Sequence, residues 1–353
     1  MAVSHSYRGV DWTDVESHLA QFHLHEPRNR ITATSSVHEP TVAKERLPDG
    51  IKKNALSPAS SPGTLVEKYR YTGYTVMALT EHEYYIDRTK RKDEPYSPEF
   101  DVTSWPWTEW GVDPDELGMV PIRGAELRGY VPELERTHDV LSLDTDVGHG
   151  KDRDLGAVIE EVGATGGLAY LAHPAKYVTP EEWELYRPHF EATDALLGVE
   201  VFNANDRYPA GRELWDRLLT HFGADRPIWA IANDDYHARP RKSNDRRFDR
   251  SRNVLLLPER SREAVRSALV NGQYYVQYND QSMAPFIETI EDDGSTITIR
   301  APDARAIEWI GAGETLATGS TVALGDLPAV EYVRAELHGA GEAVTCTQPF
   351  YLE

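Results

Sequence analysis

Two histidines stand two residues apart near the start of the chain, in the stretch Gln21–His25. At this spacing, side chains of an extended strand project from the same face. The imidazoles of His23 and His25 can then point at one centre, which is how a strand offers two nitrogen ligands to a metal ion. The proline in the following run 26–29 stops the strand, so we expect the pair at the strand's carboxyl end.

Further histidines and carboxylates adjoin other apolar segments that are typical of buried strands. In chain order, these candidate site residues are His82, Glu126, His138, His173, Asp235 and His237. Six of the 13 histidines are therefore placed next to predicted strands. Because the carboxyl ends of parallel strands meet at one edge of a sheet, where enzyme sites are built, we predict a single metal site.

The elements that must position these residues alternate between strand and helix. Strands are predicted over 74–80, 119–122, 139–143, 167–172, 196–202 and 228–232, and helices over 64–73, 154–162, 182–190 and 213–222. This alternation favours an α/β fold with a parallel sheet closed, or nearly closed, into a barrel. From about residue 275, short alternating strands separated by Gly, Asp and Pro predict a small antiparallel β domain. We therefore divide the chain into 1–274 and 275–353, and the role of the second part stays open.

The cysteine content limits the choice of metal. The chain has one cysteine, Cys346, which excludes a multi-cysteine zinc or iron-sulfur site. Ligands must therefore be His, Asp and Glu, a set that favours manganese, zinc or iron.

The charge and hydropathy limit partners and location. A net charge of -21, from 58 acidic and 37 basic residues, repels nucleic acid and anionic membranes. The same charge is typical of proteins that stay hydrated in concentrated salt, so we expect a halophilic host; ordinary acidic-surface drift is the alternative. The sequence has no apolar run of the roughly 20 residues that span a bilayer and no signal pattern, which predicts a soluble, cytoplasmic protein.

The ordered motifs resemble the PHP (polymerase and histidinol phosphatase) family of metal-dependent phosphoesterases over most of residues 20 to 240. The motifs that carry the resemblance are His23-Leu24-His25, Thr80-Glu81-His82, Gly124-Ala125-Glu126, the lone His138, Leu171-Ala172-His173-Pro174, Gly198-Val199-Glu200-Val201-Phe202-Asn203 and Asp234-Asp235-Tyr236-His237. The resemblance implies a distorted (β/α)7 barrel of PHP type that holds two or three divalent metal ions.

The resemblance also implies how the ligands divide among the metals. His23, His25, Glu126 and Asp235 would hold the first metal, and Glu126 would bridge to a second one at His138 and His173. His82 and His237 would hold a third. The family usually has an Asp or His a few residues after His-x-His, whereas this chain continues with Glu26. The remaining third-site ligand is therefore left open among Glu26, His38 and Asp49.

The expected activity is hydrolysis of a phosphate ester, either a small phosphomonoester or a nucleotide-type phosphodiester, by a metal-activated water. Glu126 and Asp235 would hold the metals, while Lys176 and Arg207, which follow two of the predicted strands, would contact the phosphate. Their alternative role is that of solvated surface cations. Two other functions stay open: metal-dependent hydrolysis of a non-phosphate bond, and a metal-stabilised binding module without catalysis.

Overall fold

The computed structural model describes residues 3–25, 62–82, 105–148, 150, 153–237 and 247–352. Its α-helices within these ranges are α2 (Pro62–Tyr71), α3 (Pro114–Leu117), α4 (Leu155–Ala164), α5 (Arg187–Ala192), α6 (Gly211–Phe222) and α7 (Arg262–Asn271). The predicted helices at 64–73, 154–162 and 213–222 correspond to α2, α4 and α6. The predicted helix at 182–190 is instead divided into a 3-10 turn at Pro180–Leu185 and helix α5. Pro188 stands in the first turn of α5, where its fixed φ favours the start of a new helix.

One sheet of eleven strands runs through both ends of the chain. Nine strands form its main path in the order β1 (Val3–His5), β21 (Phe350–Leu352), β19 (Tyr332–His338), β20 (Val344–Cys346), β13 (Tyr274–Tyr278), β12 (Ser251–Leu257), β2 (Glu16–Gln21), β4 (Tyr74–Ala78) and β5 (Val120–Ile122). The other two are β16 (Ala306–Gly311) and β17 (Glu314–Thr318), which extend from β19. Strands β2, β4 and β5 are parallel, as predicted for the α/β part.

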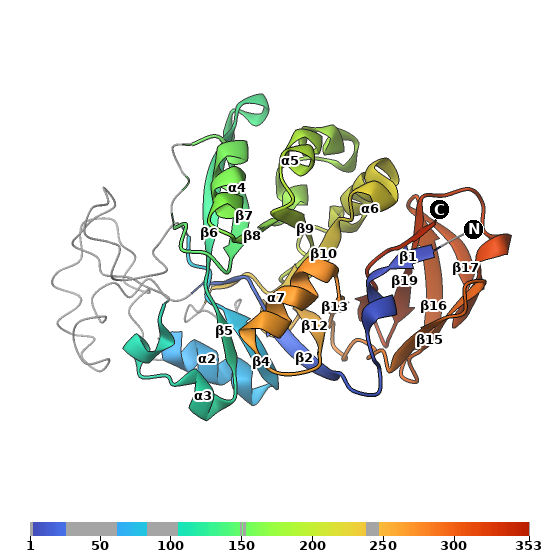
Figure 1. The fold of residues 1–353 in the computed structure, drawn as a ribbon, viewed down its shortest axis with the longest axis horizontal. Coiled ribbons are helices and arrows are strands. Elements are labelled where there is room, and N and C mark those ends of the chain that lie inside the picture. The colour runs from blue at the N-terminus through green and yellow to red at the C-terminus, as the bar shows by residue number, and fades with distance from the viewer. Residues whose placement is uncertain are drawn as a thin grey trace.

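A second sheet of five strands carries the middle of the chain. Its order is β10 (Trp229–Asn233), β9 (Leu196–Asn203), β8 (Leu168–Leu171), β7 (Arg136–Leu143) and β6 (Gly124–Val131). Strands β8, β9 and β10 are parallel and completely buried, whereas β7 runs antiparallel to both of its neighbours. Figure 1 shows this sheet beside helices α4, α5 and α6. The mixed α/β class is thus confirmed.

The two sheets adjoin without forming one closed barrel in the described part of the chain. At one side, β5 continues through Arg123 into β6. At the other side the side chain of Asn253 on β12 takes the place of a strand ladder, because its amide pairs with both the N–H and the C=O of Ala232 on β10, at 3.0 and 2.8 Å. The predicted closed ring of hydrogen-bonded strands is therefore absent from the described residues, where a side chain bridges β12 and β10.

The predicted boundary near residue 275 falls inside a continuous sheet. Strand β13 pairs with β12 on one side and with β20 on the other. Strand β1 adds the N-terminus to the C-terminal strand β21, and Figure 1 shows both chain ends at that side of the molecule. A smaller antiparallel sheet of β14 (Thr289–Asp292), β15 (Thr296–Arg300) and β18 (Thr321–Ala323) completes this region. The division into two domains stays a prediction.

Buried polar contacts connect the C-terminal region to helix α6 and strand β10. Arg334 on β19 forms a bidentate ion pair with Asp216 on α6, at 2.7 and 2.8 Å. The amide of Gln348 pairs with the N–H and C=O of Ala230 on β10, both at 2.9 Å. Strand β10, which leads directly to Asp235, is therefore braced from the C-terminal side.

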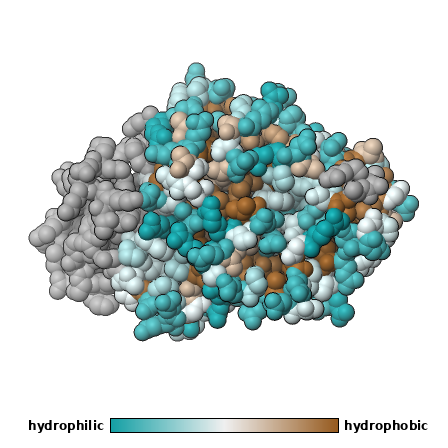
Figure 2. Space-filling model, viewed as in Figure 1, coloured by the Kyte–Doolittle hydropathy of each residue, from teal (hydrophilic) through white to brown (hydrophobic). Residues whose placement is uncertain are grey.

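No helix in the described ranges combines the length and apolar character needed to cross a bilayer. The face in Figure 2 is mostly hydrophilic, with small apolar patches between the polar side chains.

Candidate metal centre

Glu126, on strand β6, lies completely buried at the middle of the candidate site. Its Oε1 lies 3.3 Å from His23 Nε2 and 3.1 Å from His173 Nε2. Its Oε2 lies 3.5 Å from His25 Nε2 and in close contact with His82 Nδ1. One carboxylate thus touches four imidazoles that come from three separate parts of the chain.

The first group of possible metal ligands consists of His23, His25 and Glu126, with Asp235 beside them. Asp235 Oδ1 lies 3.1 Å from His25 Nε2 and 3.7 Å from His23 Nε2. The predicted strand that carries the two histidines is interrupted: β2 ends at Gln21 and β3 spans Leu24–His25. Even so, both side chains face the same pair of carboxylates.

The second group consists of Glu126, His173 and Asp139. His173 Nε2 lies 3.8 Å from Asp139 Oδ2. His138, which was expected here, makes other contacts: its Nε2 is hydrogen-bonded to the Tyr186 hydroxyl at 2.8 Å and its Nδ1 to the Asp139 carbonyl at 2.7 Å. The structure therefore brings Asp139 rather than His138 to this group.

The direction of strand β7 explains this difference. The prediction treated the segment as one more parallel strand, yet β7 is antiparallel to β8, so its beginning lies at the carboxyl end of β8. At that end of the sheet, the backbone carbonyl of Asp139 accepts a hydrogen bond at 3.1 Å from the backbone N–H of Ala172, the residue before His173. Neighbouring residues of a strand point to opposite faces, so only one of His138 and Asp139 can face the centre.

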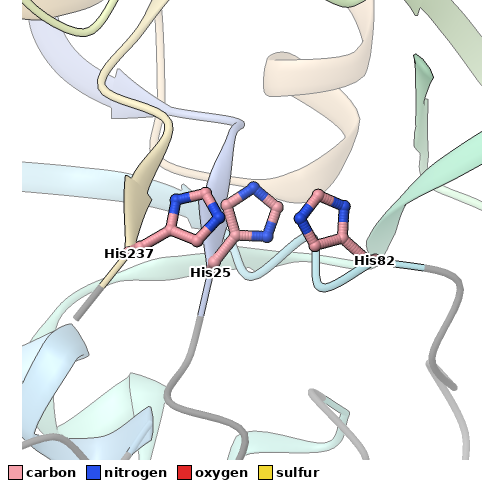
Figure 3. Close-up of side chains that lie close together, drawn as sticks. All are labelled: His25, His82 and His237. Carbon is pink, nitrogen blue, oxygen red and sulfur yellow. The ribbon is translucent and has the colours of Figure 1, made fainter. Parts of the chain in front are cut away.

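The third group consists of His25, His82 and His237. Figure 3 shows the three imidazoles in a row, with His25 between the other two. The ring of His25 lies 4.2 Å from that of His82 and 4.1 Å from that of His237. The outer two side chains are 15% and 23% exposed, whereas His25 is 1% exposed, so this group opens toward solvent. The candidates for a further ligand, Glu26, His38 and Asp49, lie outside the described residues.

Two residues of the site have unusual backbone conformations. His173 has φ +32° and Asp235 has φ +44°, in the left-handed region that non-glycine residues rarely adopt. Such conformations persist only where the surroundings enforce them, and they gather at functional sites. Here they turn the chain sharply after β8 and β10, which directs His173 toward Glu126 and Asp235 toward His23 and His25.

The buried carboxylates change the acid-base properties of the histidines. Burial by itself lowers the pKa of His23, but Glu200, Glu126 and Asp235 raise it well above its ordinary value. Burial likewise opposes protonation of His25, and the nearby Asp235 and Glu81 raise its pKa to about 9. The buried carboxylates thus favour positive charge at His23 and His25.

The carboxylates respond in the opposite direction. Burial raises the pKa of Glu126, but His82 and His23 lower it well below its ordinary value. Burial also raises the pKa of Asp235, and His23 and His25 lower it well below the usual range. Both groups therefore stay ionised in the interior, where an uncompensated charge is very unfavourable. This arrangement requires positive charge between the side chains.

Unpartnered ligand atoms indicate that metal ions fit this site. His23 Nε2, His25 Nε2, His82 Nδ1 and Glu126 Oε2 are buried and make no hydrogen bond to any residue that the structure describes. The Nδ1 of His23 donates to Glu200 at 3.0 Å, which leaves the lone pair of the neutral ring on Nε2. That lone pair faces the oxygens of Glu126 and Asp235, and a divalent cation bound by all three satisfies them together.

Both predicted catalytic cations lie at the edge of the site. Lys176 Nζ is 2.9 Å from Asp139 Oδ2, and an Arg207 terminal nitrogen is 2.5 Å from Asp235 Oδ2. Their side chains are 37% and 29% exposed, so each can reach solvent as well as its carboxylate. The Nε of Arg207 is buried and has no hydrogen-bond partner among the described residues. Each cation therefore forms an ion pair with a carboxylate of the candidate site.

No known protein-family model matches the sequence, and no curated protein matches it. One similar solved structure is a two-domain protein from Bacteroides vulgatus that contains a predicted PHP-like metal-dependent phosphoesterase. It is 15% identical, with a TM-score of 0.49, and the match covers 100% of this chain and 90% of that one.

Proposed function

We propose that this chain hydrolyses a phosphate ester in a centre of two or three divalent metal ions. The observation that carries the proposal is Glu126, a completely buried carboxylate in contact with the imidazoles of His23, His25, His82 and His173. A carboxylate has two oxygens and can bridge two metals, while each neutral imidazole supplies one nitrogen. The remaining carboxylate ligands are Asp235 in the first group and Asp139 in the second.

The side chains divide the chemical work. When bound, divalent metal ions would supply Lewis acidity to the phosphoryl oxygens and lower the pKa of the attacking water. Asp235 faces the histidines with Oδ1 and Arg207 with Oδ2, whereas Oδ2 of Asp139 faces both His173 and Lys176. These cations orient the two carboxylates, and their exposed parts can bind the oxygens of a phosphate that enters from solvent.

The cations favour a phosphate ester over a neutral substrate. An amide or a lactone needs no basic residue beside the metals, whereas the charge on a transferring phosphoryl group is stabilised by Lys and Arg.

The ligand groups among the described residues contain no thiolate, which favours manganese, zinc or iron as the metal. The two adjoining sheets support a PHP-type barrel in which a side-chain contact at Asn253 replaces one ladder. We further propose a cytoplasmic protein from a halophilic host.

The test combines metal analysis with two model esters. Protein purified at high salt is examined for bound metal, then assayed with p-nitrophenyl phosphate and bis-p-nitrophenyl phosphate after addition of manganese, zinc or iron. We expect two to three metals per chain and turnover, with the preferred ester separating a monoesterase from a diesterase. The Asp235→Asn variant serves as a control for contaminating phosphatases and should be inactive. Bound metal without turnover would instead support a non-phosphate hydrolase or a binding module, and absence of bound metal would refute the centre.

A further inference from the structure

Glu200, in the middle of strand β9, is a buried carboxylate that stands behind the candidate ligands. Its Oε1 accepts hydrogen bonds from His23 Nδ1 and Asn233 Nδ2, both at 3.0 Å. Its Oε2 accepts hydrogen bonds from the backbone N–H of His173 and from Asn203 Nδ2, both at 2.9 Å. Four donors from four separate positions of the chain thus converge on one side chain.

These contacts distinguish Glu200 from a metal ligand. Its oxygens lie close enough to His23 and His173 for the three residues to form a possible ligand group. An ionised carboxylate offers about four acceptor positions, and here four donors occupy them. Glu200 therefore has no free lone pair for a metal, and its effect on the centre must act through the residues that it holds.

At His23, Glu200 decides which nitrogen faces the centre. The bond from Nδ1 fixes the ring so that Nε2 points at Glu126 and Asp235. A carboxylate behind a metal-binding histidine orients the ring and increases its basicity, and loss of such a partner typically costs about 10-fold to 100-fold in metal affinity.

At His173, Glu200 holds the backbone. The bond from His173 N forms at the residue whose φ of +32° is unfavourable for a side chain with a Cβ. That backbone conformation places His173 Nε2 3.1 Å from Glu126 Oε1. Loss of the bond would remove one of the contacts that enforce the turn.

The network also extends to the strand that carries His23. Asn233, held by Glu200 through its Nδ2, accepts a hydrogen bond through its Oδ1 from the backbone N–H of Phe22 at 2.8 Å. Glu200 therefore fixes the residue next to His23 as well as the imidazole itself.

We propose that Glu200 is a positioning residue that couples the first and the second metal group, so that its loss weakens metal binding at both. The inference rests on the metal centre of the proposed function, and it is independent of the substrate. Glu200 holds one ligand of each group, His23 in the first and His173 in the second, while Glu126 belongs to both.

The test is Glu200→Gln in the full-length protein. Glutamine keeps the size of the side chain, but its amide nitrogen must face two of the four donors, whichever oxygen it replaces. We expect the affinities of both metal equivalents to fall by about 10-fold to 100-fold in calorimetric titrations of metal-free protein with Mn²⁺ and Zn²⁺. The matched control is Glu336→Gln, which replaces a carboxylate bound to Arg334 in the C-terminal sheet and should leave metal affinity unchanged.

Wild-type affinity at both equivalents in Glu200→Gln would overturn the inference, and weakening of only one would refute the coupling. If this variant does not fold, Asn203→Ala removes a single donor and keeps the charge. A several-fold weaker second equivalent in Asn203→Ala would then support the inference, and unchanged affinity would contradict it. A wild-type protein that binds metal without hydrolysing either ester would end the proposed activity but leave this test valid.

Discussion

Exchanging one ligand candidate at a time on strand β7 would decide which residue completes the second metal group. The variants are Asp139→Asn and His138→Gln, which change neighbouring residues on opposite faces of the same strand. Asp139 belongs to a possible ligand group with Glu126 and His173, whereas both ring nitrogens of His138 are engaged elsewhere. The two changes should therefore have different consequences.

The expected magnitudes follow from the contacts. Burial and the charge of Glu126 raise the pKa of Asp139, but His173 and Lys176 lower it below its ordinary value, so the carboxylate is ionised at neutral pH. Its replacement by Asn should remove the second metal. We expect this change to remove about 4 kcal/mol of transition-state stabilisation, which corresponds to a fall of about 10³-fold in kcat/KM. His138→Gln disturbs two hydrogen bonds between uncharged groups, which should cost about 2 kcal/mol of stability and leave the metal content unchanged.

The assay measures metal stoichiometry, kcat/KM and the free energy of unfolding in urea for both variants. Asp139→Asn should lose one metal equivalent and most of the activity. If His138→Gln loses the metal while Asp139→Asn retains it, the assignment of Asp139 is refuted and the ligand set implied by the family resemblance is restored.

Three further predictions concern stability and substrate binding. Dialysis against a chelator should lower the free energy of unfolding by about 3 kcal/mol relative to protein with metal at 100 times its dissociation constant, and identical urea midpoints would argue against a metal centre. Arg207→Met should lower kcat/KM for p-nitrophenyl phosphate by about 10-fold or more, since a hydrogen bond to a charged group contributes about 1.5 to 3 kcal/mol; unchanged kinetics would place Arg207 outside the reaction. Burial raises the pKa of Glu336, but Arg334 lowers this pKa below its value of 4.5 in the unfolded chain. The stability that the ionised Glu336 contributes is therefore present above pH 4.5 and is lost as the pH falls through the pKa of the folded state. Glu336→Gln should therefore flatten the acid side of the stability profile, and parallel profiles in urea unfolding from pH 6 to 3 would contradict this role.

Much of the fold could be predicted because local pattern decides it. The helices at α2, α4 and α6 follow from apolar periodicity and from nearby turn or capping signals, and the buried strands β8, β9 and β10 from continuous apolar runs. The closed barrel could not be predicted correctly in the same way, because strand pairing is a property of the assembled sheets. Between β12 and β10, the side chain of Asn253 pairs with the backbone of Ala232 in place of a strand ladder.

The sequence by itself determined the kinds of ligand available, histidine and carboxylate without thiolate, and the strand ends at which they occur. Only the tertiary structure brought Asp139 rather than His138 beside Glu126 and His173, because the direction of β7 determines which end of the strand lies at the site and the alternation of side chains determines which neighbour faces it. Glu200 stands in one of the sequence motifs, but only the tertiary structure revealed its contacts. No spacing in the sequence indicates that a residue in the middle of a buried strand receives donors from His23, His173, Asn203 and Asn233. Spacing along the chain predicts what one strand can offer, whereas hydrogen bonds between distant strands exist only after the sheets have packed.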